Sequence, residues 1–241
     1  MKVAVYNDCF TPRYKHFGCE LVMETIKDQL ERVDIEYIGS ITKDEIRDKS
    51  KINELFDKSD LVIVNGEGSF HHNRRNDILD IGDKWNSILI NTVYQNNTPD
   101  SRLSKFKYIS CRESFSAKAM SENMGKPIDT VPDVIFTNKR LHDLKFNPTK
   151  DLIKVRHGSE LSTKNSADYF MKTLADHKRI SSISYHALII SIILGQEIHE
   201  VMPSNTHKNE ALIHDFNSDP NYVDNSRKSV NDLFDQLHTL I

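Results

Sequence analysis

The chain has 241 residues, of which 38% are hydrophobic and 28% are charged, and its formal net charge is -3. That length suits one large domain or two modest ones, and the small net charge provides no global attraction to nucleic acid or to an anionic membrane. No apolar run reaches the roughly twenty residues that a membrane span needs, and the first residues have the pattern of a strand rather than a signal peptide. We therefore expect a cytoplasmic protein with no transmembrane segment and no nucleic-acid partner.

The N-terminal segment predicts a strand, a polar loop and a helix. A β-branched run over residues 2–6 predicts the strand, and apolar residues at helical spacing predict a helix over 19–32. The loop between them begins with Asn7 and carries the cations Arg13 and His16. Gly18 at the helix entrance either lets backbone N–H groups face an anion or a sugar hydroxyl, or is only a turn glycine.

The strongest strand signal is the run from Leu61 to Val64, because four consecutive apolar residues are typical of a strand covered on both faces of a parallel sheet. The run continues into Gly66, Glu67, Gly68 and Ser69, a turn whose glycines let backbone N–H groups face a ligand. The third glycine of the dinucleotide fingerprint is missing. Glu67 is either a catalytic base or a solvent-facing loop acid.

The remaining pattern alternates strands and helices, which favours a parallel, doubly wound α/β architecture. Arg112 lies between one of these strands and a serine-capped helix. Its planar guanidinium either binds a carboxylate or phosphate of a ligand or forms an ion pair at the surface. Strands are expected over residues 35–38, 87–94, 107–111, 129–136, 152–155 and 200–203, and helices over 44–58, 77–85, 166–174 and 229–240.

Residues 180–195 predict a short strand, a polar corner and a buried helix that ends at Gly195. In open α/β folds, ligands bind at the carboxyl ends of strands, so the corner with Ser184 and His186 is a candidate site. Histidine exchanges protons near neutral pH, and His186 is our first candidate for chemistry. The three cysteines lack the paired spacing of a zinc site, and we expect free thiols and no metal.

Four segments, in this order, resemble the polysaccharide pyruvyl transferase family. The resemblance implies two Rossmann-like lobes with parallel sheets, similar to B-type glycosyltransferases, with the active site in the cleft between them. It also implies transfer of the enolpyruvyl group of phosphoenolpyruvate to sugar hydroxyls of a cell-surface polysaccharide precursor, which forms a pyruvate ketal and phosphate. The segments are residues 7–21, residues 59–69, the corner 111–116 with 131–133 downstream, and residues 184–187.

The family commonly carries an arginine two residues before the histidine, where this chain has Ser184. The chain is also shorter than is usual for the family, so we expect the second lobe to be shortened, with lobes at 1–105 and 106–241. Phosphoenolpyruvate is a donor substrate, and no cofactor is expected. Two other functions stay open, a nucleotide-sugar glycosyltransferase and a family member that binds glycan without catalysis.

The resemblance and the residue types together assign roles to ten residues. The catalytic candidates are His186 and Glu67; the donor candidates are Arg112, Ser184, Arg13 and His16; the acceptor candidates are Asn7, Gly66, Gly68 and Ser69.

Overall fold

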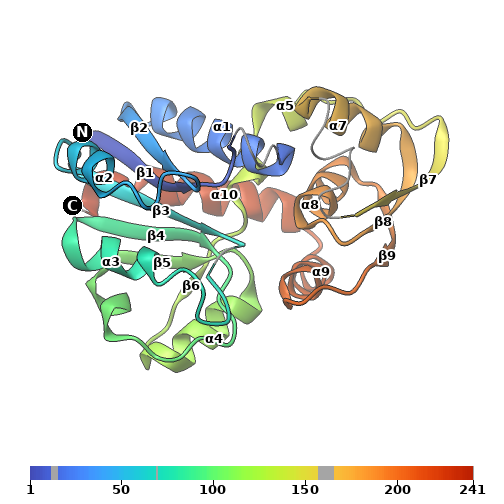
Figure 1. Ribbon diagram of the computed structural model, residues 1–241. Helices are drawn as coiled ribbons and strands as arrows, with labels where there is room; N and C mark the ends of the chain where they lie inside the picture. The colour runs from blue at the N-terminus through green and yellow to red at the C-terminus, as the bar shows by residue number, and fades with distance from the viewer. Residues whose placement is uncertain (12–15, 69, 157–165, 241) are drawn as a thin grey trace.

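Two parallel sheets organise the computed structural model, which describes residues 1–11, 16–68, 70–156 and 166–240. Among these residues one sheet has six strands in the order β2-β1-β3-β4-β5-β6, and the other has three in the order β7-β8-β9. All strand pairs are parallel. Figure 1 shows the six-stranded unit and the smaller three-stranded unit side by side. The expected fold, with two parallel α/β units of which the second is shortened, is confirmed.

The first sheet and its helices extend over the N-terminal part of the chain. Its elements are β1 (Lys2–Asp8), α1 (Phe17–Arg32), β2 (Glu36–Thr42), α2 (Lys49–Phe56), β3 (Leu61–Glu67), α3 (Asp77–Lys84), β4 (Ser87–Thr92), the 3-10 helix η1 (Ser101–Lys105), β5 (Tyr108–Cys111), α4 (Ser114–Met124), β6 (Asp129–Thr130), the 3-10 helix η2 (Val134–Thr137) and α5 (Lys139–His142).

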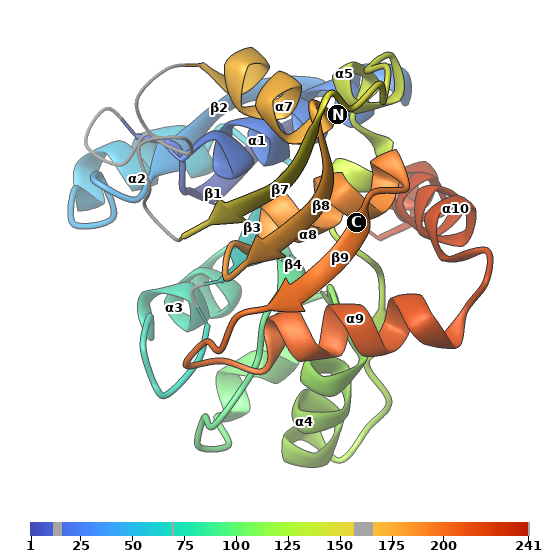
Figure 2. The same cartoon turned by 90° about the vertical axis from the view of Figure 1, so that its right-hand side faces the viewer.

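The second sheet is followed by helices that return to the first unit. Its elements are β7 (Lys150–Val155), α7 (Ala167–Ala175), β8 (His177–Ser182), α8 (Tyr185–Leu194), β9 (Glu197–Val201), α9 (Lys208–Ser218), α10 (Tyr222–Asp235) and the 3-10 helix η3 (Leu237–Thr239). Figure 2 looks onto these three strands, with α7 on one side and α9 on the other.

The first sheet is buried on both faces because its strands are apolar at successive positions. Val3 and Val5 of β1 point into one hydrophobic cluster, while Ala4 and Tyr6 point into the other, as the two-residue period of a strand requires. Apolar burial of this kind is the main favourable term in folding. The consecutive apolar residues of β1, β3 and β4 therefore specify a covered parallel sheet.

One of these clusters is shared by the two units. It contains β1, β3 and α1 residues of the first unit together with α7, β8 and α8 residues of the second. The rings of Phe17 and Phe170 lie 6.3 Å apart across the junction. Arg140 bonds both Glu24 of α1 and Asp168 of α7, each at 2.7 Å. The C-terminal helix α10 also contacts α1 and η2, which brings both chain ends to the first unit in Figure 1. The two units therefore share one continuous apolar core.

Several expected elements differ from the structure. The expected strand over 129–136 is a two-residue strand followed by η2, because Pro132 has no N–H for a ladder and the Asp133 carboxylate accepts a bond from Ile135 N, which starts the 3-10 turn. The expected helix over 44–58 begins only at Lys49. The expected division at 105/106 precedes β5, whereas the first sheet continues to β6 and the second begins with β7.

Helix α9 was not among the predicted elements. The structure has the predicted strand-corner-helix at residues 180–195, with Gly195 as a left-handed cap of α8.

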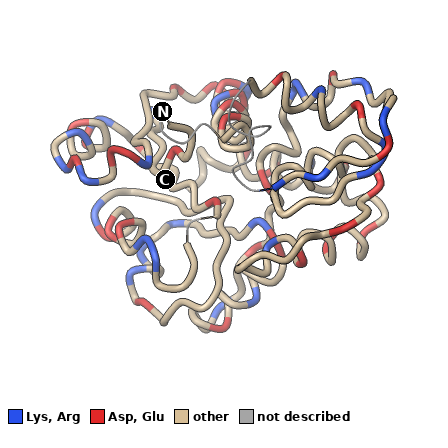
Figure 3. Tube along the Cα trace, turned by 45° about the vertical axis from the view of Figure 1, so that its right-hand side comes forward, with Lys and Arg blue, Asp and Glu red and all other residues tan. Residues whose placement is uncertain are grey.

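None of the helices in the described ranges combines the length and apolarity of a membrane span. Basic and acidic residues are interspersed along both units in Figure 3.

The shared core predicts that the units unfold together. Trp85, the single tryptophan, lies in the first unit beside α3, whereas Ile190 is fully buried in α8 of the second. We expect Ile190→Ala to lower the free energy of unfolding by about 2–5 kcal/mol and to shift the urea midpoint of Trp85 fluorescence. Tyr169→Ala, at a residue 51% exposed on α7, is the control and should change stability by less than about 0.5 kcal/mol. A Trp85 transition that does not respond to Ile190→Ala would contradict a shared core.

Candidate active site

Polar residues gather where the carboxyl ends of β3 and β5 meet the first turns of α1, α8 and α9. Parallel strands end at the same edge of a sheet, and α8 follows β8 directly, so the two units bring their ligand-binding edges together at this junction. Glu67 ends β3, Arg112 follows β5, His186 lies in the first turn of α8 and Lys208 begins α9.

A buried ion pair lies at the centre of the site. Arg112 Nη1 donates to Asp133 Oδ2 at 2.8 Å, and the two side chains are 1% and 0% exposed. The guanidinium also lies over the ring of Tyr185, with its Cζ 3.8 Å from the centroid. Burial alone would raise the pKa of Asp133, but the nearby imidazole of His186 and the charge of Arg112 outweigh it and lower the pKa. Asp133 is therefore a carboxylate at neutral pH.

His186 is placed between two carboxylates. Its Nε2 lies 3.6 Å from Asp133 Oδ2 and 3.8 Å from Glu67 Oε1, and the residue is 5% exposed. On its other side the ring packs on Gly18 in the first turn of α1, where a Cβ would lie only 2.2 Å from His186 Nδ1. The absence of a side chain at Gly18 therefore makes room for the imidazole. This is the structural role of a glycine at the entrance of α1.

Glu67 receives hydrogen bonds at both oxygens. Cys19 Sγ donates to Oε1 at 2.8 Å, and Asn65 Nδ2 donates to Oε2 at 3.3 Å. Burial would raise the pKa of Glu67, but the charge of His186, the bond from Cys19 and the charge of Arg112 lower it. The carboxylate therefore stays ionised, 3.8 Å from His186 Nε2.

The backbone at this edge is in an uncommon conformation. Asn7, Glu67 and Asn91, close to the carboxyl ends of β1, β3 and β4, have φ angles of 67°, 40° and 55°. Asn91 Nδ2 donates to Asn65 Oδ1 at 3.1 Å, which links β4 to β3 through buried amides. Left-handed φ at residues other than glycine costs free energy and concentrates at functional sites.

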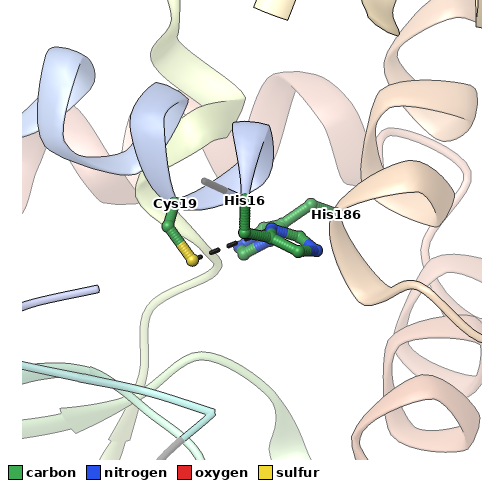
Figure 4. Close-up of side chains that lie close together, drawn as sticks. All are labelled: His16, Cys19 and His186. Atoms are coloured by element: carbon green, nitrogen blue, oxygen red, sulfur yellow. Dashed lines mark hydrogen bonds between the residues drawn. The ribbon is translucent and has the colours of Figure 1, made fainter. Parts of the chain in front are cut away.

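His16, Cys19 and His186 have potential metal-ligand atoms within 4.8 Å of one another (Figure 4). The hydrogen bond with Cys9 and burial raise the pKa of Cys19 well above its usual value, and the thiol proton is donated to Glu67. A metal requires the thiolate. The three groups can hold an ion only when that proton is lost, and the expectation of no metal stays a prediction. As expected, the three cysteines are free thiols, and all are buried.

Four of the predicted catalytic and donor residues come together. His186, Glu67 and Arg112 meet as described above, and the ring of His16, at the N-cap of α1, lies with its centroid 5.7 Å from that of His186. Ser184 is 1% exposed at the N-cap of α8, and its hydroxyl has no hydrogen-bond partner within the described parts of the chain.

The predicted acceptor residues have mainly local partners. The side chain of Asn7 donates to Asn65 O at 2.6 Å and accepts from Arg75 Nη1 at 2.7 Å. Gly66 packs on Thr92, whose Oγ1 would lie 2.2 Å from a Cβ. Gly68 faces the cations of the site instead, as described below. Two further candidates, Arg13 and Ser69, lie outside the described residues.

Sequence reasoning missed Cys19 as a partner of Glu67, Asp133 as the partner of Arg112, and Lys208. Lys208 Nζ lies 3.5 Å from the position of a Cβ on Gly68, and Arg112 Nη2 lies 3.7 Å from it. Burial and the charge of Arg112 lower the pKa of Lys208 to about 8. The charge on the segment 205–210 is mixed, and no pattern in it indicates a buried lysine.

Comparison with known proteins supports the fold. No family model and no curated protein sequence matches the chain. A crystal structure of an uncharacterized protein from Klebsiella pneumoniae is similar with a TM-score of 0.68 and 18% identity, over 91% of this chain and 88% of that one. An α-glucosyltransferase solved with UDP-glucose and DNA containing an abasic site has a TM-score of 0.47 and 8% identity, over 97% of this chain and 95% of that one.

The contact between Gly18 and His186 generates a stability prediction. Alanine is favoured over glycine within a helix by roughly 0.5–1 kcal/mol, but at position 18 its Cβ collides with the imidazole. We expect Gly18→Ala to destabilise the native chain and the same substitution in a His186→Ala background to stabilise it. Chemical denaturation of the four chains measures this coupling. Equal effects of Gly18→Ala in both backgrounds would contradict the packing described.

The Arg112–Asp133 pair predicts an acid dependence of stability. The pKa of Asp133 is lower in the native chain than its ordinary value of 3.8, so the stabilisation is present above that value and is lost as the pH falls through the native pKa. We expect Asp133→Asn to remove this part of the acid dependence. At pH 7 it should cost on the order of 3–5 kcal/mol, because Arg112 stays buried without its counter-charge. Denaturation curves from pH 2 to 7 test both effects.

Proposed function

We propose that this chain is a pyruvyl transferase that moves the enolpyruvyl group of phosphoenolpyruvate onto sugar hydroxyls of a cell-surface polysaccharide precursor. The observation that carries the proposal is the placement of His186, with Nε2 within 4 Å of two buried carboxylates, Glu67 and Asp133, and with Asp133 paired to Arg112. The histidine suits a donor that must be protonated on carbon, and the arginine suits a donor that is anionic.

The reaction requires one proton on the methylene carbon of the donor. In the proposed course His186 protonates that carbon while one sugar oxygen bonds to the neighbouring carbon, which also bears the carboxylate and the phosphate ester. The second sugar oxygen then displaces phosphate and closes the ketal. One hydroxyl proton restores His186 and the other leaves with phosphate, so atoms and charges balance.

The surrounding residues support these steps. Glu67 and Asp133 orient the imidazole, and the lowered pKa of each keeps it ionised beside the ring. Arg112 is held flat by the ring of Tyr185 and is a permanent cation beside the reacting centre. The proposal places the sugar at the edge formed by β1 and β3, where Asn7 and Gly66 shape the backbone.

The proposal predicts acceptor-dependent release of phosphate from phosphoenolpyruvate. Methyl hexopyranosides of gluco, galacto and manno configuration are suitable first acceptors, because each has pairs of hydroxyls that a ketal can bridge. We expect His186→Ala to lower kcat by about 10²–10⁴-fold, as loss of a general acid does. His199→Ala is the matched control, since His199 is exposed on β9, and it should retain full turnover.

Ligand-induced stabilisation separates this activity from the alternatives. A ligand at a hundred times its dissociation constant stabilises the native chain by about 2.7 kcal/mol, which a thermal shift detects. Stabilisation by phosphoenolpyruvate supports the proposal. Stabilisation by nucleoside diphosphates alone would instead indicate a nucleotide-sugar glycosyltransferase, and stabilisation by oligosaccharide alone would indicate a glycan-binding protein. Normal turnover in His186→Ala would exclude His186 as the acid.

A further inference from the structure

We infer that Arg112 and Lys208, one from each unit, form a binding site for a phosphate dianion above the backbone of Gly68. The identification of this phosphate with that of phosphoenolpyruvate rests on the proposed function, but the anion site itself is argued from the contacts below. Lys208 becomes, in this inference, a donor-binding residue of the second unit.

Arg112 has an unused hydrogen-bonding edge. Its Nη1 donates to Asp133, whereas its buried Nε has no hydrogen-bond partner in the parts of the chain that the structure describes. Nε and Nη2 lie on one side of a guanidinium and match two oxygens of an oxyanion. Nη2 points toward Gly68, 3.7 Å from the position of a Cβ. Arg112 is 1% exposed, and a buried donor such as this Nε is costly unless a ligand accepts from it.

Lys208 approaches the same point from the other unit. Its Nζ lies 3.5 Å from the Cβ position of Gly68, so two cations converge on one glycine. The described residues include no ion pair of Lys208 within 4.0 Å. Burial and the positive charge of Arg112 lower its pKa to about 8, while Glu67 and Cys19 act in the opposite direction. The positive charge of Arg112 disfavours a second cation beside it, and a bound anion relieves that repulsion.

The position of Lys208 is fixed by bonds to both units. His207 N, one residue before it, donates to Gln95 Oε1 at 3.0 Å, and Asn209 Nδ2, one residue after it, donates to Ile183 O at 2.9 Å. Further along α9, Asp215 caps the first turn of α4 by accepting from Ser114 N at 2.9 Å. The start of α9 is therefore held in place without the lysine side chain, which leaves that side chain for a ligand.

The chemistry of the two cations favours a phosphate. The fork of arginine matches a pair of oxygens, whereas the ammonium of lysine is a compact charge that accepts any orientation of a tetrahedral oxyanion. Lys208 adds a positive charge to that of Arg112, whose Nη1 already bonds Asp133. Gly68 is half-buried and has no side chain, so its backbone leaves the space between the cations open to the ligand.

Titration of the full chain with inorganic phosphate in a calorimeter tests the inference. We expect Lys208→Met to weaken phosphate binding by about 10–100-fold, as loss of a charge-assisted bond does. The matched control is Lys118→Met, which removes an equal charge from an exposed position on α4 and should leave the affinity unchanged. Lys208→Arg should retain much of the binding.

Two further measurements separate a ligand-binding role from a structural one. Lys208→Met removes a half-buried cation beside Arg112, so we expect it to raise the melting temperature in phosphate-free buffer, whereas loss of a structural residue lowers it. Gly68→Ala places a methyl group at ordinary contact distance from both cations, and it should fold normally and weaken phosphate binding.

The outcomes distinguish this inference from the proposed function. Wild-type phosphate affinity in folded Lys208→Met, or no phosphate binding by the unaltered chain, overturns the inference. Unimpaired turnover of phosphoenolpyruvate by Lys208→Met overturns the inference that Lys208 binds the donor phosphate, while the proposed function stands. Phosphate binding that depends on Lys208 in a chain that does not turn over phosphoenolpyruvate supports the anion site and counts against the proposed function.

Discussion

The buried charge of Arg112 is the constraint on which the junction depends. Taking a guanidinium out of water is expensive, and a counter-charge and good geometry are needed to offset the cost. Here the counter-charge is Asp133, from the turn after β6, and the supporting ring is Tyr185, from the start of α8. Three segments far apart in the chain must therefore dock together before this side chain can be buried. The same docking brings His186 to Asp133 and Glu67.

Part of the site opposes stability. Left-handed backbone at Asn7 and Glu67 and the approach of Lys208 to Arg112 each disfavour the native state. The shared apolar core of α1, α7, α8 and β1 offsets these costs. Such strain is expected where ligand recognition, rather than folding, selects the residues, and it lies at the edge of the sheet where parallel folds bind ligands.

Elements with one dominant signal were predicted well. The apolar run 61–64 forms a strand and the run 185–194 forms a helix, as expected, because a continuous apolar segment is stable only when it is buried. The strand expected over 129–136 was wrong beyond residue 130, since Pro132 and the side chain of Asp133 redirect the backbone locally. Helix α9 was not predicted, because its sequence is mixed in polarity and its stability comes from packing on α4 and α8.

The sequence by itself determined the parallel α/β class and three central candidates, His186, Glu67 and Arg112, because strand ends followed by polar corners are local patterns. The shortened second unit was expected from the family resemblance alone. Only the tertiary structure decided which groups meet. The pairing of Arg112 with Asp133, and the approach of Lys208 to Gly68, join residues 21 and 140 positions apart, and no local pattern encodes those distances. The physical reason is that the packing of the two units around one apolar core decides which side chains meet at the junction. That packing depends on the whole folded chain.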